Sequence, residues 1–244
     1  MKTEEFISAL SNIKMDDQAR FERLRAGLPL GVDEAGEIVL ARTDSKNGRA
    51  NHLCVTGSQR GEFIKRLLLT LFRLYGKTEL SVLLLSPDAA YSDLLTLKIA
   101  DITAPYVRSQ ADLDAALLSI NELVRMREEN GAQKYPRLFV VLDGLEEIVK
   151  DENGLLDAYK PFLEKTLGTG VEVITGVDLL KSIFSGYPGA FVGIGNCLVT
   201  ADGEGKTDVT FVGEDSSLSL PTSLDYPCEP SVEELVAAWN GAEN

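Results

Sequence analysis

The sequence contains few residues of the kinds that bind metals or form disulfides. Its 244 residues include one histidine and three cysteines, with no C-x-x-C pair. Structural zinc sites use closely spaced cysteine and histidine, so we expect no metal site in this chain. Cys54 and Cys197 lie within apolar, strand-like runs, and we therefore expect them to be buried and reduced.

Long apolar runs and excess positive charge are also lacking. No apolar run is long enough to span a bilayer. The first ten residues, MKTEEFISAL, are acidic and have no apolar centre, unlike a signal peptide. With 24 Lys and Arg against 38 Asp and Glu, the formal net charge is −14. This charge argues against nucleic acid as the main partner, although a local basic patch stays compatible with it. We expect a cytoplasmic protein without direct membrane insertion.

The remaining composition is that of a globular protein. The chain is 44% hydrophobic and 25% charged, and it is long enough to bury a large core. Residues 1–26 predict an N-terminal helical segment with one apolar face, which either packs on the edge of its own domain or binds a partner. Residues 27–244 predict a single domain. The apolar face of the first segment consists of Phe6, Ile7, Leu10 and Ile13.

Strand-like and helix-like segments alternate along that domain. The strand-like runs are continuous and apolar, which suits a sheet covered on both faces. They fall at 52–56, 80–85, 138–142 and 171–175. The helix-like segments between them fall at 62–75, 110–130 and 154–166. This order predicts an α/β fold with a mainly parallel central sheet flanked by helices.

Local signals place further boundaries. Strand-like runs at 196–200 and 208–212 flank DGEGK, which predicts a hairpin turn. Ser109 is expected to cap the helix that follows it. Near the end of the chain, Ser231 and Glu234 have the spacing of a capping box.

The stretch CVTGSQRGEF begins like a phosphate-binding loop and then departs from it. A P-loop has the pattern G-x-x-x-x-G-K-[ST], whereas here three residues separate the glycines, and Glu62 and Phe63 stand where Lys and Ser/Thr are expected. Glu62 reverses the charge that would attract phosphate, an attraction of roughly 3 kcal/mol at about 5 Å and an effective dielectric near 20. Phe63 has no hydroxyl for magnesium. We therefore expect no cofactor, or at most weak ATP and magnesium. The degenerate loop comprises Gly57, Ser58, Gln59, Arg60, Gly61, Glu62 and Phe63.

Two further strand ends carry polar residues where ligands bind in open α/β sheets. Asp143 ends an apolar strand, as a Walker B aspartate does, but it is also a common turn residue. Gly144 follows it, where hydrolytic enzymes have a glutamate. Thr175 and Asp178 end and follow the strand at 171–175, and they are the candidates for a polar sensor.

Taken in order, these segments resemble the FtsK/SpoIIIE family of P-loop ATPases. The resemblance implies a RecA-like P-loop fold and covers roughly residues 27–200. The changes at the loop, at Gly144 and at Asp178 resemble the degenerate C-terminal ATPase modules of type VII secretion coupling proteins of the EssC/EccC group. The segments that carry the resemblance are LPLGVDEAGEIVLA (28–41), NHLCVTGS (51–58), VLLLSPD (82–88), YPRLFVVLDGLEEI (135–148) and GVEVITGVD (170–178).

The resemblance implies a pseudo-ATPase with no catalytic residues, acting in protein recognition or regulation within a type VII secretion-like apparatus at the membrane. The implied partners are neighbouring ATPase modules and secreted helical substrates. Two alternatives stay open: a nucleotide-sensing module in which Arg60 reaches a phosphate, and an active DNA-translocating ATPase. The loop at 179–195 is a candidate partner contact, through Phe184, Tyr187 and Phe191, or else an ordinary loop that covers the core.

Overall fold

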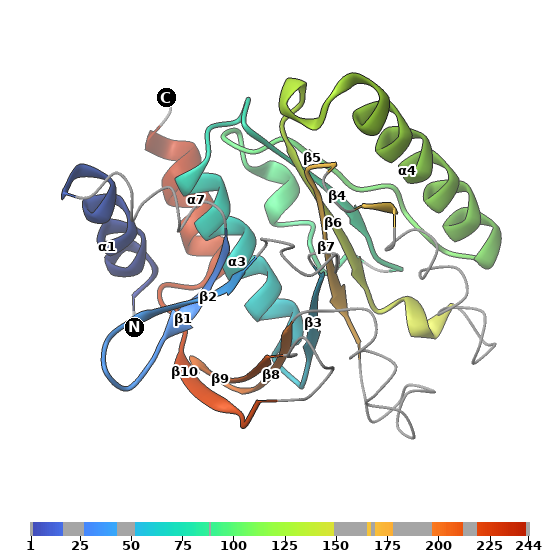
Figure 1. Cartoon of the computed structure of the whole chain (residues 1–244). Coiled ribbons are helices and arrows are strands. Elements are labelled where there is room, and N and C mark those ends of the chain that lie inside the picture. Colours follow the sequence, from blue (N-terminus) through green and yellow to red (C-terminus); the bar gives the residue numbers. More distant parts are fainter. Residues whose placement is uncertain are drawn as a thin grey trace.

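A computed structural model describes most of the chain: residues 2–16, 27–42, 52–87, 89–148, 165–166, 169–177, 197–211 and 219–242. These residues form one ten-stranded sheet with helices on both faces (Figure 1). The strands are β1 Gly27–Val32, β2 Ile38–Arg42, β3 His52–Thr56, β4 Leu80–Leu85, β5 Ile102–Thr103, β6 Arg137–Asp143, β7 Val171–Gly176, β8 Cys197–Gly203, β9 Lys206–Phe211 and β10 Thr222–Asp225.

The sheet has a parallel part and an antiparallel extension. Its strand order is β2-β1-β10-β9-β8-β3-β7-β6-β4-β5. The pairings from β8 through β3, β7, β6 and β4 to β5 are parallel. Those from β8 through β9, β10 and β1 to β2 are antiparallel. The parallel centre confirms the sequence prediction, and β8 and β9 form the predicted hairpin.

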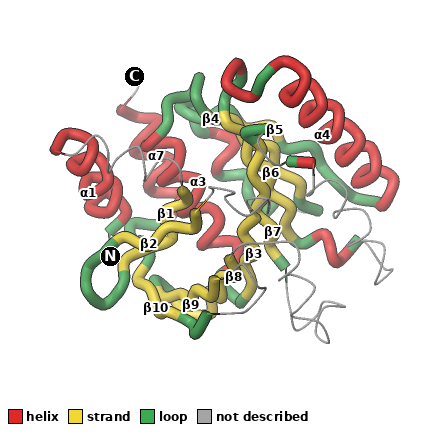
Figure 2. Tube along the Cα trace, viewed as in Figure 1, coloured by secondary structure: helices red, strands yellow, loops and turns green. Residues whose placement is uncertain are grey.

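Helices cover the two faces of the sheet (Figure 2). On one side lie α3 and α7, with α1 beside them, and on the other lies α4. The α-helices are α1 Thr3–Asp16, α3 Arg60–Leu74, α4 Gln110–Asn130 and α7 Val232–Ala242, and the 3-10 turns are η1 Leu94–Thr96, η2 Ala132–Lys134 and η3 Leu145–Glu147. Most of the predicted helix at 154–166 lies outside the described residues.

Each face of the sheet has its own hydrophobic core. The alternation of side chains along β6 shows this: Phe139 and Val141 join the core under α3 and α7, whereas Val140 and Leu142 join the core under α4. A strand buried on both faces must be apolar throughout, which explains the uninterrupted run in the sequence.

The predicted helix starts are confirmed. The Oγ of Ser109 accepts the backbone N–H of Asp112 at 3.2 Å at the start of α4. Ser231 and Glu234 form the reciprocal capping box before α7, with distances of 3.0 and 3.2 Å. Across the described segments, no helix combines the length and apolarity that a membrane span requires.

Candidate nucleotide site

The carboxyl ends of the central parallel strands meet at one edge of the sheet. In open α/β folds this edge binds ligands. Here β3 leads through a short loop into α3, β6 ends at Asp143, and β7 ends at Gly176. The loop and the Walker B-like aspartate of the sequence analysis are thus brought together.

The loop after β3 is shorter than a P-loop. Only Gly57, Ser58 and Gln59 separate the strand from the helix, because α3 begins at Arg60. Gly57 has a φ of +102°, and a Cβ there would lie 2.4 Å from the carbonyl oxygen of Ala201. Gly61 lies in the first turn of α3, and nothing lies within 4 Å of the position of its Cβ. The second glycine of the motif is therefore a helix residue and not part of the loop.

Two backbone N–H groups of this loop donate hydrogen bonds to the end of β8. The N–H of Ser58 donates to the Asp202 carboxylate at 3.1 Å, and that of Gln59 donates to the Ala201 carbonyl at 2.8 Å. The Ser58 hydroxyl also donates to the Asp202 carbonyl, at 3.2 Å. In a P-loop, N–H groups at these positions bind phosphate. Here protein oxygens accept their hydrogen bonds.

Both carboxylate oxygens of Asp143 are also engaged. Oδ1 accepts a hydrogen bond from Arg60 Nε at 2.9 Å, and Oδ2 accepts one from the Tyr91 hydroxyl at 2.9 Å. A second nitrogen of Arg60 lies 3.4 Å from Glu146. The Asp143 side chain is 8% exposed and lies against Gly176, where a Cβ would be 2.0 Å from Oδ1. Only glycine at the end of β7 leaves room for this arrangement.

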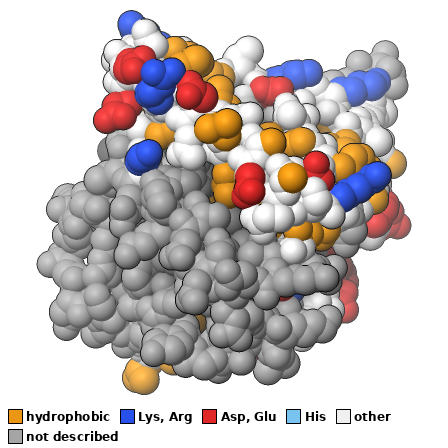
Figure 3. Space-filling model, turned by 90° about the vertical axis from the view of Figure 1, so that its right-hand side faces the viewer, with side chains coloured by type: hydrophobic (Ala, Val, Ile, Leu, Met, Phe, Trp, Pro, Cys, Tyr) orange, Lys and Arg blue, Asp and Glu red, His pale blue; other side chains and the backbone are white. Residues whose placement is uncertain are grey.

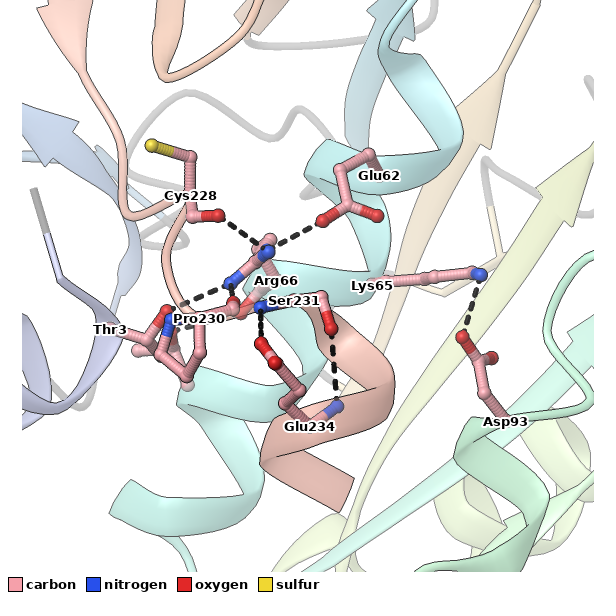
Figure 4. Close-up of polar contacts among 10 residues, drawn as sticks. Thr3, Glu62, Lys65, Arg66, Asp93, Cys228, Pro230, Ser231 and Glu234 are labelled. Carbon is pink, nitrogen blue, oxygen red and sulfur yellow. Dashed lines mark hydrogen bonds and ion pairs between the residues drawn. The ribbon is translucent and has the colours of Figure 1, made fainter. Parts of the chain in front are cut away.

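Glu62 and Phe63 each contact other residues of the domain. Glu62 accepts a hydrogen bond from Nε of Arg66 at 2.7 Å, one turn further along α3, whereas Lys65 points the other way, toward Asp93 (Figure 4). Phe63 is 2% exposed and packs edge-on against Tyr226, with ring centroids 5.2 Å apart. The two residues that replace lysine and serine or threonine in the motif are thus part of the packing around α3.

The remaining predicted site residues fall into two groups. Gly144 has a φ of +70°, and its N–H donates to the Gly176 carbonyl at 3.3 Å, which ties the end of β6 to β7. Thr175 is buried within β7, beside Cys54 and Leu142 in the register. The other candidates lie outside the described residues: Asp178, Phe184, Tyr187 and Phe191.

Sequence reasoning missed three residues of this site. Asp202 belongs to a segment recognised only as a hairpin turn, and Tyr91 follows β4 in a stretch without a motif. Gly176 was visible as a glycine at a strand end, a signal of close approach by another group. Their partners lie 144, 52 and 33 positions away along the chain, respectively.

The arrangement does not fit magnesium-bound ATP. The loop has no lysine, its N–H groups at Ser58 and Gln59 are bonded, and both oxygens of Asp143 are taken. No group of three or more potential metal-ligating side chains occurs within the part of the chain that the structure describes.

The cysteines of the central strands take no part in this chemistry. Cys54 and Cys197 are free and buried, as predicted, and burial raises the pKa of both thiols. They lie on adjacent strands, β3 and β8, within the protein interior.

Known structures share this fold. No protein-family model and no curated protein matches the sequence. The cytoplasmic domain of the Thermomonospora curvata Type VII Secretion ATPase EccC matches 89% of this chain with a TM-score of 0.65 and 12% identity. EccC ATPases 2 and 3, in complex with a signal sequence peptide, match 84% with a TM-score of 0.59 and 13% identity. EssC ATPases 2 and 3 from Geobacillus thermodenitrificans match 89% with a TM-score of 0.58 and 13% identity.

The fold is therefore that of a P-loop ATPase domain. Among solved structures it resembles the ATPase modules of type VII secretion ATPases. The chain spans 31%, 41% and 48% of those three structures, which corresponds to part of a larger protein in each.

Proposed function

We propose that this chain is a catalytically degenerate ATPase module that acts in protein recognition or regulation within a type VII secretion-like translocation apparatus. The observation that carries the proposal is the state of Asp143, whose two oxygens are bonded to Arg60 and Tyr91. An aspartate so engaged is unsuited to hold magnesium for phosphoryl transfer. The chain keeps the fold, but the aspartate that would hold magnesium for hydrolysis is hydrogen-bonded to other side chains.

The nature of the partner follows from the neighbours and from the surface. One similar structure, EccC, is a complex with a signal sequence peptide, which supports a protein as the ligand. The face that carries α4 shows hydrophobic side chains among charged ones (Figure 3). On that helix Leu118 is 66% exposed and Met126 is 41% exposed. With a net charge of −14, the chain is suited to protein partners rather than nucleic acid. We expect these partners to be neighbouring ATPase modules and secreted helical substrates, met on the cytoplasmic side of a membrane.

The test combines turnover with partner binding. ATP hydrolysis by the purified chain is measured with and without DNA, and we expect no turnover in either case. Binding of the helical substrates and ATPase modules of the same secretion system is then measured by calorimetry, and we expect at least one of them to bind. ATP turnover would contradict the degenerate assignment, and the absence of binding to every such protein would contradict the recognition role.

A further inference from the structure

Several of the groups that would meet a nucleotide in this fold are bonded to the protein itself. In two of these contacts, a charged side chain of the protein occupies the position that a ligand of the same charge would take. One lies at the loop after β3, and the other lies at the end of β6.

At the loop, a carboxylate stands in for an anionic ligand. Asp202 accepts the N–H of Ser58 at 3.1 Å, beside the start of α3. A carboxylate resembles a phosphate oxygen in charge and in its ability to accept such a bond, and the first turn of a helix favours negative charge. The close approach depends on Gly57, since any larger residue would collide with the Ala201 carbonyl.

At the end of β6, a guanidinium stands in for a cation. Arg60 donates to Asp143 at 2.9 Å and lies 3.4 Å from Glu146. The side chains of Asp143 and Glu146 are both 8% exposed, so an unpaired carboxylate there would be costly. Arg60 is the first residue of α3, and its position is therefore set by the same loop that receives Asp202.

We propose that the nucleotide site of this chain is filled by its own side chains, with Asp202 in place of a phosphate and Arg60 in place of the metal ion. The loop after β3 and the end of β6 are then held in place by protein side chains without any ligand. This inference goes beyond the proposed function and does not depend on which partner the module recognises.

The experiment is calorimetric titration of the full chain with inorganic pyrophosphate and with magnesium-bound ATP. The variants are Asp202→Ala, Arg60→Ala and the double variant. Matched controls are Glu204→Ala, which removes an exposed acid from the same hairpin, and Arg125→Ala, which removes an exposed arginine paired on α4. We expect no binding up to millimolar concentration for the wild type and the controls.

Each single variant should release one of the two contacts, either at the loop after β3 or at the end of β6. Asp202→Ala should bind pyrophosphate at least about tenfold more tightly than the wild type, because one opposing charge is removed and one N–H group is released. The double variant should bind magnesium-bound ATP more tightly than either single variant, since Oδ1 of Asp143 is then also released while Oδ2 keeps its bond from Tyr91.

Three results would overturn the proposal. One is micromolar binding of magnesium-bound ATP by the wild type that Arg60→Ala abolishes, because Arg60 would then be a phosphate ligand. Another is unchanged pyrophosphate binding in a folded Asp202→Ala variant, with folding checked by circular dichroism. If that variant does not fold, Asp202→Asn removes the charge but keeps the oxygen, and unchanged binding by it would count equally against the proposal. Partner binding enters none of these results, so this proposal can fail while the recognition role of the proposed function holds.

Discussion

Arg66 joins three separate parts of the chain beneath α3, and its replacement tests how the domain is held together. Its side chain is 3% exposed and donates to Glu62 of the same helix. It also donates to the Thr3 hydroxyl at 3.0 Å, at the start of α1 (Figure 4). The backbone carbonyls of Cys228 and Pro230, before α7, accept from it at 2.7 and 2.5 Å.

The magnitude follows from what Arg66→Met would leave behind. Methionine has a similar length but no donors, so the buried Thr3 hydroxyl and two part-buried carbonyls lose their partner. Leaving a buried hydrogen-bonding group without its partner costs roughly 1–3 kcal/mol, and with three such groups, two of them only part-buried, we expect the free energy of unfolding to fall by about 3–5 kcal/mol. For a typical domain, with a total of about 5–15 kcal/mol, this is a large fraction. Glu62→Gln should cost less than Arg66→Met, because the glutamine side-chain oxygen can still accept the hydrogen bond from Nε of Arg66.

The assay is urea unfolding followed by the fluorescence of Trp239, the single tryptophan of the chain. Its indole N–H donates to Glu4 at 2.7 Å, so it reports directly on the contact between α7 and α1. Arg125→Met is the matched control, since that arginine is 61% exposed and water screens its ion pairs, so its replacement should change the stability little. A loss no larger for Arg66→Met than for this control would refute the reasoning that Arg66 stabilises the fold.

Three further predictions concern the loop, a buried acid and the thiols. Gly57→Ala should destabilise the fold by roughly 1–3 kcal/mol, through backbone strain and a collision of the new Cβ with the Ala201 carbonyl. Gly61→Ala should stabilise the fold by about 0.5–1 kcal/mol, because Gly61 lies within a helix. Both changes are measured by urea unfolding, and equal losses for the two variants would contradict the assigned helix start. Burial raises the pKa of the Glu172 carboxyl in the folded protein, although Arg137 donates a hydrogen bond to it. The stabilisation from this group is therefore complete below the pKa of the unfolded chain, and it is lost as the pH rises through the higher pKa of the folded protein. Glu172→Gln should remove this component from urea midpoints measured between acidic and neutral pH, and an unchanged pH profile would contradict it. In native protein a thiol reagent should modify Cys228 first, because the cysteines of β3 and β8 are buried with raised pKa values; rapid modification of all three would contradict this burial.

The sequence by itself determined the parallel centre of the fold. Periodicity and capping are local signals: an uninterrupted apolar strand reports burial on both faces, and Ser231 with Glu234 reports a helix start within four residues. The same local reading found that the loop after β3 lacks the lysine and the hydroxyl of a working P-loop. It showed which groups are missing from the site.

Only the tertiary structure decided which groups took their place. Asp202 reaches Ser58 across 144 positions of sequence, and Arg66 reaches Pro230 across 164. Nothing in the local pattern of either residue specifies such a partner, because a hydrogen bond between distant residues depends on strand order and on the close approach that Gly57 permits. The parallel pairing of β8 with β3, which brings the end of β8 to the loop after β3, is likewise a long-range pairing. The sequence therefore determined the elements and the departures from the motif, and the packing of the sheet decided which side chains meet at the ends of β3, β6 and β8.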